Sequence, residues 1–421
     1  MTEVLQEQRG RNLQRRVIFA TLALMYILVY FYRVSLAVVA QDVSRELQLS
    51  PRQLGSLSGI LFFVYALVQI PLGPMIDRLG SRLVIGACGV LTTIGGLLFS
   101  QADTLSGAMT ARMMIGVGTA SVLMATFTLF SHWYTRQEFG RMSGLMVAVG
   151  NLGNILATAP LALVVSAMGW RAAFLTVGII QAMATLLVFL KVQDRPEAGS
   201  SVAGHTASGQ GGMLAAWREI FGNRNFLLLG GISFFWYGNY LALQGLWGGP
   251  YLQELLLLPQ VAAGRILMFT AVGFIAGSMV IDSVARKVVR SYKKTLLAGQ
   301  LFLLLLMTGF LGWLELLPQP LLAVAFFLIG LAVSSGVMIY PVIRTTFPLR
   351  ITGTALTSLN FFVLMGAALT QQIMGVIIGH MRNGVSGSSP AAYHAAFLFP
   401  LLGLALAIIA YAFAKDTGVG N

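Results

Sequence analysis

The chain has 421 residues, of which 57% are apolar and only 10% carry a charge. A soluble domain carries about 25% charged residues, so this composition excludes an ordinary water-soluble protein and favours one that buries its surface in lipid. The formal net charge of +13 admits a polyanionic partner, and the distribution of charge along the chain decides that question below. The single Cys88 excludes a disulfide framework, and we expect neither a metal nor another cofactor.

Apolar segments follow one another along the whole chain, each near the roughly 20 residues that a membrane-spanning helix needs. The twelve predicted spans are 17–40, 54–76, 83–101, 106–130, 142–167, 172–192, 225–249, 262–284, 294–315, 319–343, 354–379 and 391–414. The connections are short except for 194–224, where many Gly and Ser residues predict a flexible linker. This linker divides six spans from six.

The predicted division gives five parts. They are an N-terminal tail at 1–16, a six-helix bundle at 17–193, a linker at 194–224, a second six-helix bundle at 225–415 and a tail at 416–421. With the amino terminus placed in the cytoplasm, 20 of the 27 Lys and Arg residues lie on the cytoplasmic side and 5 on the other. This positive-inside bias predicts an inner-membrane protein with both termini cytoplasmic, and it explains the basic charge without nucleic acid.

A charged turn between two spans occurs twice. The turn around Asp77 recurs around Asp282, 205 residues later, and each copy closes an apolar segment and is followed by basic residues. Gly116 in the fourth span has a similar counterpart in Gly330 of the tenth, at an offset of 214 residues. Two related halves within a membrane are typical of transporters.

These features resemble the major facilitator superfamily, and the resemblance covers nearly the whole chain. It rests on the signatures Gly73…Asp77-Arg78…Gly80…Arg82, Arg112…Gly116, Gly169-Trp170-Arg171 and Asp194-Arg195-Pro196. The resemblance implies an all-α membrane protein with 12 transmembrane helices in two pseudo-symmetric six-helix bundles around a central cavity, working by alternating access. Within the superfamily the chain is most similar to bacterial organic-anion permeases of the anion:cation symporter type.

The resemblance also implies a gate. In this family the Asp of the charged turn lies against the amino-terminal end of a helix in the opposite half, where the helix dipole favours a carboxylate. The expected neighbour of Asp77 is the eleventh span and that of Asp282 is the fifth. The alternative is a pair of solvated loop acids. The predicted gating residues are Gly73, Asp77, Arg78, Gly80, Arg82 and Asp282.

Two arginines, Arg33 and Arg112, lie within predicted spans, and no acidic residue lies deep in a span. Charges inside a membrane are costly, so each is a candidate site residue. Tyr26, Tyr30, Arg33 and Ala37 follow at steps of 4, 3 and 4, which predicts one helix face suited to a carboxylate. A structural role near the headgroups is the alternative for Arg33, and bracing of the bundle is the alternative for Arg112.

A second polar face is predicted in the seventh span, followed by a helix break at Gly-Gly-Pro, residues 248–250. An aromatic belt at the membrane surface is the alternative, and isolated Asn, Gln and Tyr residues such as Tyr65 and Gln69 favour helix–helix hydrogen bonds. The predicted substrate-binding residues are Arg33, Tyr26, Tyr30, Arg112, Tyr237, Tyr240, Gln244, Asn151 and Asn360.

The proton-relay residues of organic-anion symporters are missing from this sequence. An Asp usually precedes the arginine of the first span, where Tyr32 stands here, and the fourth span has no acid. Either a proton enters together with the anion or one anion is exchanged for another. We expect a monomeric secondary transporter of a small organic anion, with a possible co-transported proton and the lipid bilayer as its surroundings.

Three other functions were weighed. An exporter of drugs or metabolites would carry a Gly-Pro-rich signature in the fifth span, which matches only loosely here. A non-transporting membrane receptor would be expected to carry a signalling domain, and the predicted tails are short. No catalytic triad, metal cluster or nucleotide loop is present in the sequence, so we expect no enzyme and no ATP-driven transport.

Overall fold

The computed structural model describes the chain apart from residues 1, 196–216, 383–388, 417 and 419–421. All regular elements of the described residues are helices. Most of the predicted linker at 194–224, and most of the predicted tail at 416–421, lie outside the described residues. Helices prevail because lipid offers no hydrogen-bond partner, so each backbone group must find one within its own segment.

The helices of the first half occupy the sequence up to residue 191. They are α1 (Thr2–Val34), α2 (Leu36–Glu46), α3 (Pro51–Leu79), α4 (Ser81–Ser100), α5 (Leu105–Ala120), α6 (Val122–Trp133), α7 (Arg136–Gly150), α8 (Leu152–Leu156) and α9 (Ala159–Lys191). Polar caps begin several of them. Capping boxes of Ser50 with Gln53 and of Thr135 with Glu138 satisfy free backbone N–H groups at the starts of α3 and α7.

The second half follows the same order with more irregular turns. Its elements are α11 (Arg224–Ala242), the π-helix η1 (Leu243–Trp247), α12 (Gly248–Glu254), α13 (Gln260–Ser283), the π-helix η2 (Val284–Val289), α14 (Tyr292–Met307), the 3-10 helices η3 (Thr308–Leu311) and η4 (Trp313–Leu316), α15 (Gln319–Val333), the 3-10 helix η5 (Ser334–Met338), α16 (Ile339–Thr346), α17 (Leu349–Arg382) and α18 (Pro390–Ala412).

Each predicted span falls on a helical segment, and the second, predicted at 54–76, forms α3. Eleven helices of the described residues are long and apolar enough to cross a membrane. The twelfth span appears once α9 is divided at Gly169, where φ is 79° and ψ is 163°. The part of α9 before Gly169 ends the fifth span, which begins as α7, and the part after it is the sixth. The fold is therefore the predicted one of 12 transmembrane helices in two six-helix bundles.

The repeated glycines make the same contact in both halves. A Cβ on Gly116 of α5 would lie 2.6 Å from the carbonyl oxygen of Leu61 on α3. A Cβ on Gly330 of α15 would lie 2.0 Å from the carbonyl oxygen of Thr270 on α13. Small residues let helix backbones approach closely in membranes, so the repeat marks one packing contact used twice.

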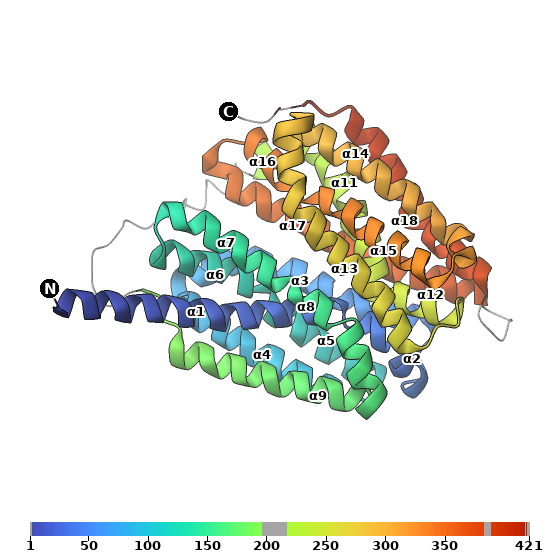
Figure 1. The fold of residues 1–421 in the computed structure, drawn as a ribbon, viewed down its shortest axis with the longest axis horizontal. Coiled ribbons are helices and arrows are strands. Elements are labelled where there is room, and N and C mark those ends of the chain that lie inside the picture. Colours follow the sequence, from blue (N-terminus) through green and yellow to red (C-terminus); the bar gives the residue numbers. More distant parts are fainter. Residues whose placement is uncertain (1, 196–216, 383–388, 417, 419–421) are drawn as a thin grey trace.

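Figure 1 shows the helices in two groups, one from each half, which approach each other at one end and diverge toward the other. We name these the closed end and the open end. At the closed end a Cβ on Gly59 of α3 would lie 2.7 Å from the carbonyl oxygen of Ala368 on α17. At the open end, Cβ atoms on Gly73 of α3 and Gly353 of α17 would meet nothing within 4 Å. Thus α3 and α17 pack tightly along one part of their length and separate along the other.

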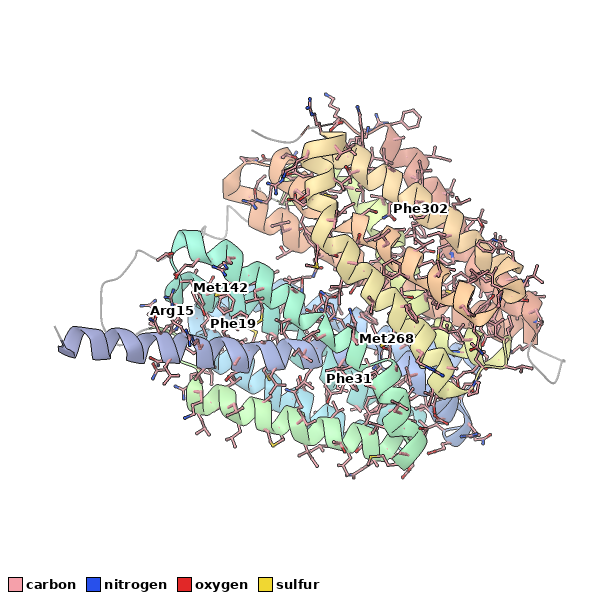
Figure 2. All side chains as sticks on the ribbon, viewed as in Figure 1. Arg15, Phe19, Phe31, Met142, Met268 and Phe302 are labelled. Carbon is pink, nitrogen blue, oxygen red and sulfur yellow. The ribbon has the colours of Figure 1, made fainter. Side chains whose placement is uncertain are left out.

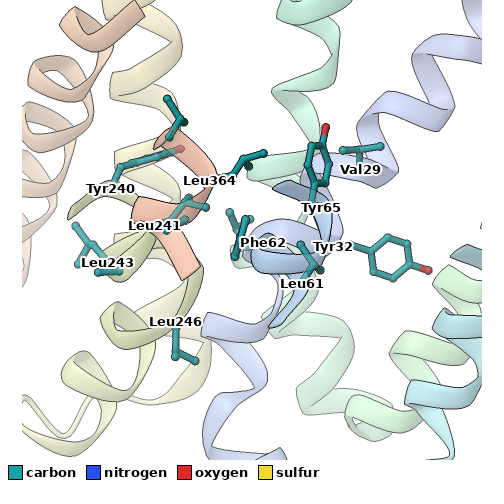
Figure 3. Packing of buried hydrophobic residues seen from close by; sticks show 14 of the residues in the cluster. Val29, Tyr32, Leu61, Phe62, Tyr65, Tyr240, Leu241, Leu243, Leu246 and Leu364 are labelled. Atoms are coloured by element: carbon teal, nitrogen blue, oxygen red, sulfur yellow. The ribbon is translucent and has the colours of Figure 1, made fainter. Parts of the chain in front are cut away.

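The outer surface is apolar, as lipid requires. Figure 2 shows Phe302 on the outward side of α14, and this side chain is 38% exposed. Phe31 of α1, by contrast, is buried between helices. Between the halves, Figure 3 shows Phe62 of α3 facing Leu241 of α11 and Leu364 of α17. Apolar packing therefore joins the halves around the residues described next.

Candidate functional site

Arg33 lies in the last turn of α1, between rings of two neighbouring helices. Its guanidinium carbon is 5.1 Å from the ring centre of Tyr30 and 4.7 Å from that of Tyr65 on α3. Aromatic faces attract cations, most strongly where water is excluded, and Arg33 is only 8% exposed. Tyr26 joins the group because its hydroxyl lies 3.4 Å from that of Tyr30. The structure thus brings three predicted residues of α1 together.

The second half completes this group with hydroxyls of its own. Tyr237 of α11 and Tyr340 of α16 both interact electrostatically with Arg33. Tyr340 nevertheless keeps 37% of its surface exposed, although its neighbours are largely buried. An exposed side chain among buried ones marks open space at this position. The Arg33 group, formed by Arg33 and tyrosines 26, 30, 65, 237 and 340, therefore lies where the two halves meet.

No acidic partner neutralises Arg33 within the described part of the chain. The ion pairs found there join other groups and none of them includes Arg33. The Nε atom of Arg33 is buried and has no hydrogen-bond partner. A guanidinium has five donors and cannot lose its proton in a protein. The arrangement can therefore receive an anion, and the surrounding tyrosines offer hydroxyls to the rest of a ligand.

Arg112 of α5 lies in a different setting. It is fully buried, and its guanidinium donates to the carbonyl oxygen of Tyr32 at 3.1 Å and to that of Leu57 at 3.4 Å. These bonds connect α5 to α1 and α3 inside one bundle. Tyr32 itself is directed toward α4, since a Cβ on Gly96 would lie 2.5 Å from its hydroxyl. Its ring points away from the contact between the halves (Figure 3).

The expected break of the seventh span lies elsewhere than predicted. Gly248, Gly249 and Pro250 are helical and begin α12, which continues directly from η1. The irregular part is η1, just before them, and it carries Gln244. The prediction at 248–250 was wrong because the glycines serve packing: a Cβ on Gly249 would lie 1.7 Å from the carbonyl oxygen of Ala37.

The predicted helix face on α1 is also shorter than expected. The helix is interrupted at Ser35, and Ala37 belongs to α2, where it contacts α12 of the other half. Of the face on the seventh span, Tyr237 faces Arg33, whereas Tyr240 stacks on Phe274 at 5.4 Å. Gln244 is fully buried, and neither atom of its amide has a partner.

The two predicted asparagines differ in their contacts. The Asn151 amide donates to the Val147 carbonyl of its own helix at 2.9 Å, at the break between α7 and α8. The Asn360 amide of α17 donates to the Gln69 side chain of α3 at 2.8 Å and so joins the two halves. Gln69 lies one turn beyond Tyr65 on α3, toward the open end.

A cavity of about 640 Å³ opens beyond Gln69, between α3, α6 and α17. Most of the side chains that line it are apolar, among them Ile70, Met124, Phe127 and Phe361. Gly73, Asp77 and Gly353 line the same cavity nearer the open end. The two halves are therefore separated by open space at this end and packed together at the other.

The predicted gating contacts are not formed in this conformation. Asp77 is exposed and has no hydrogen bond among the described residues, because the open cavity separates α3 from the start of α17. Asp282 pairs with Arg286 of the same half and does not reach the fifth span. Arg78 is likewise exposed.

Asp194, which closes the sixth span, occupies a helix end instead. Its carboxylate accepts a hydrogen bond of 2.8 Å from the backbone N–H of Arg82 at the start of α4. Gly80 makes this possible, because its φ of 82° suits glycine and a Cβ there would lie 2.8 Å from the Asp194 carboxylate. The signature thus holds α4 to the end of α9 within one half.

Three important residues were not singled out from the sequence as site or capping residues. Tyr65 was assigned only to helix packing, although its spacing from Gln69 already indicated a polar face on α3. Tyr340 carried no signal beyond its place in an apolar span. Asp416 belongs to no motif that the sequence repeats. Its carboxylate nevertheless accepts a 2.7 Å hydrogen bond from the Ser291 hydroxyl at the start of α14, at the position that corresponds to Asp194 and α4.

Comparisons with known proteins agree with this architecture. The chain is 24% identical over 394 residues to the probable L-galactonate transporter of Escherichia coli strain K12, covering 88% of this chain and 85% of that protein. It is 27% identical over 277 residues to the probable sulfoacetate transporter SauU of Cupriavidus necator, covering 62% of each. The membrane sensor protein UhpC of Escherichia coli is 26% identical, again covering 62% of each.

Solved structures share the fold. A bacterial homologue of the human lysosomal transporter Spinster, in an inward-facing and unoccupied conformation, superposes with a TM-score of 0.77 at 19% identity, covering 95% of this chain and 97% of that one. A D-xylose-proton symporter superposes with a TM-score of 0.73 at 14% identity, covering 96% and 99%. The family model described as "Major Facilitator Superfamily" matches residues 22–371. The chain therefore belongs to the major facilitator superfamily, and the family together with the transporter relatives indicates a transporter, not an enzyme.

Proposed function

We propose that this secondary transporter carries a small organic anion, and that Arg33 binds its carboxylate or sulfonate. The observation that carries the proposal is the buried guanidinium of Arg33, which has a free Nε donor and no acidic partner in the described part of the chain. Burying such a charge is costly unless it is paired, and an arriving anion supplies that pair through bidentate hydrogen bonds. Relatives named for galactonate and sulfoacetate support an anionic substrate.

The position of the Arg33 group supports alternating access. Arg33 and Tyr65 belong to the first half, while Tyr237 and Tyr340 belong to the second. A ligand that contacts both halves binds most tightly to the conformation in which both sets of contacts can form. Its binding therefore shifts the equilibrium toward that conformation. We assign the open end, where α1 begins and α18 ends, to the cytoplasm because of the positive-inside bias. The structure then corresponds to an inward-open state.

The same group also bears on coupling. No carboxylate lies near Arg33 among the described residues, so a central acid that carries a proton is not available there. Two routes stay open. A proton enters together with the anion, or a second anion leaves in exchange. In both cases Arg33 holds the anion while the protein, acting as a monomer, changes between its inward-open and outward-open states.

The remaining predicted residues take narrower roles in this proposal. Arg112 braces α1, α3 and α5 through its bonds to two carbonyl groups and does not contact substrate. Tyr240 and Gln244 support the side of the site that the second half forms. The Gln69–Asn360 pair lies between the Arg33 group and the cavity. Asp77, at the rim of that cavity, closes the open end when it meets the start of α17.

The proposal is tested by ligand-induced thermal stabilisation of the purified protein. Sugar acids, sulfonates, sugar phosphates, amino acids and lipophilic cations are compared on the wild type and on Arg33→Ala. We expect anions to stabilise only the wild type. Stabilisation by cations alone, or unchanged stabilisation of Arg33→Ala by the same anion, would show that the proposed substrate class is wrong.

Transport itself is measured in proteoliposomes with the anion that gave stabilisation. Uptake driven by an inward proton gradient indicates symport, whereas uptake that requires the same anion inside indicates exchange. An anion that binds but is never transported would identify a receptor instead.

A further inference from the structure

The closed end contains a polar connection between the halves that the sequence did not indicate. Gln260, the first residue of α13, donates from Nε2 to the carbonyl oxygen of Val38 at 2.9 Å and to the Oδ2 atom of Asp42 at 2.8 Å. Both acceptors belong to α2 of the first half, whereas α13 belongs to the second. One amide group therefore bridges two turns of the opposite half.

Close packing on both sides positions this bridge. Next to Val38, the carbonyl of Ala37 lies against Gly249 of α12, where a Cβ would come within 1.7 Å. One turn after Gln260, a Cβ on Gly264 would lie 2.9 Å from the Ala162 side chain of α9. The helices α12 and α13 thus hold α2 and α9 by shape alone, and Gln260 adds the directional contact among them.

Charge makes the bridge stronger than an ordinary amide contact. Asp42 accepts from Gln260 through one oxygen and from Arg45 of its own helix through the other, at 2.9 Å. An ionised carboxylate is an acceptor only, and hydrogen bonds to it are about twice as strong as neutral ones. The neighbouring charges are Glu46, one turn on, and its partner Arg171 of α9.

We propose that Gln260 is the latch of the closed end, and that this end opens only after Gln260 releases Val38 and Asp42. Asp42 is partly exposed already, so after release both groups can be hydrated and the step is reversible. The residues of the bridge lie outside the Arg33 group, and they contact no substrate in the proposed site. The inference therefore goes beyond the proposed substrate and depends only on the two halves moving apart at this end.

The latch is tested by measuring the distance between the halves without any substrate. Nitroxide labels are placed at Gln101→Cys and Leu316→Cys, two exposed positions at the closed end, in a Cys88→Ala background. Pulsed electron resonance then reports the fraction of molecules with this end open. Losing a hydrogen bond to a charged group shifts such a ratio by roughly ten- to hundredfold, so Gln260→Ala is expected to raise the open fraction at least tenfold.

A charge pair and a matched control sharpen the result. Gln260→Glu places a second carboxylate beside Asp42 and should open the end further, and adding Asp42→Asn should reverse most of that effect. Gln253→Ala on α12 is the control, because the Gln253 amide nitrogen has no partner. Unchanged distances in Gln260→Ala and Gln260→Glu, or an equal shift in Gln253→Ala, would overturn the proposal. Circular dichroism confirms that each variant is folded.

Discussion

The two halves of the molecule share one architecture but not one chemistry. Each places a glycine, Gly116 or Gly330, against the carbonyl of its second span, and in each an Asp that follows the last helix accepts a hydrogen bond from the start of the third span. Among the described residues, however, only the first half buries cations in its spans, namely Arg33 and Arg112. The second half contributes tyrosines and amides to the same central region. A duplicated fold thus fixes the framework, while the buried charge that we propose to bind an anion belongs to the first half.

The capping acids show how far the similarity reaches. Asp194 accepts from a backbone N–H at the start of α4, whereas Asp416 accepts from the Ser291 hydroxyl at the start of α14. The position is the same in both halves, but the atoms that form the contact differ. A residue of one half can therefore be substituted while the corresponding residue of the other half serves as the reference. The comparison separates effects on anion binding from effects on stability.

The largest expected effect concerns the unequal contributions to anion binding. Arg33→Lys keeps the charge but loses the planar fork, and we expect the affinity for the stabilising anion to fall about 100-fold. Tyr237→Phe, on the other half, removes only one neutral hydrogen bond and should cost no more than about tenfold. Isothermal titration of both variants measures the ratio. Equal losses would mean that the second half shares the charge recognition.

Arg112 should affect stability instead of binding. Arg112→Ala removes two charged hydrogen bonds inside the first bundle and leaves a cavity, so we expect a loss of about 2 kcal/mol or more. Arg78→Ala, which changes an exposed arginine of the same half, should stay within about 0.5 kcal/mol. Thermal melting of both variants measures these losses. A variant Arg112→Ala that melts normally but no longer binds anion would contradict the bracing role.

The contact between α12 and α2 can be compared with an uncrowded glycine of the same half. A methyl group on Gly249 would strike the Ala37 carbonyl, whereas one on Gly231 would meet nothing within 4 Å. We expect Gly249→Ala to open the closed end in most molecules and Gly231→Ala to leave it shut, or to stabilise α11 slightly. The label pair at the closed end measures this. Identical distances in both variants would contradict the close packing.

The two capping acids should differ by a smaller amount. Asp194→Asn removes a negative charge from the amino-terminal end of α4, at a cost of about 0.5–1 kcal/mol. Asp416→Asn weakens the hydroxyl contact with Ser291, and we expect less than half of that cost. Parallel thermal melts decide the order, and a larger loss for Asp416→Asn would reverse this assignment.

The smallest effect depends on pH and is confined to the first half. The backbone N–H of Thr135 and the guanidinium of Arg15 lower the pKa of Glu138 at the start of α7. The first turn of α17 has no acid. Because the folded pKa is lowered, this stabilisation is present above the ordinary glutamate value of about 4.3 and is lost as pH falls through the folded pKa.

The corresponding measurement compares the melting temperature of Glu138→Gln with the wild type as a function of pH. We expect the wild type to be more stable by a few tenths of a kcal/mol at pH 7, as for exposed pairs, with the difference vanishing in acid. A difference that grows as pH falls would have the wrong sign for this assignment.

Much of the fold could be predicted from the sequence because lipid imposes simple rules. Apolar length gives the spans, internal hydrogen bonding makes them helices, and the repeat around Asp77 and Asp282 reveals two halves. The shared face of Tyr26, Tyr30 and Arg33 on α1 followed from helical spacing. The lack of an acidic partner for Arg33 followed from the positions of the acidic residues, because none of them lies deep in a predicted span.

Only the tertiary structure decided which residues of the other helices meet. Tyr340 and Gln260 lie in segments without a periodic signal, and each acts through a helix more than 200 residues away. Gly249 was expected to break a helix and instead admits a neighbouring backbone, a difference that depends on α2 being there. Composition and spacing determine how each helix forms and which face is polar. The contacts between the halves depend on how two separate bundles pack against each other. The sequence of either helix alone does not determine which residues of the other bundle it will meet.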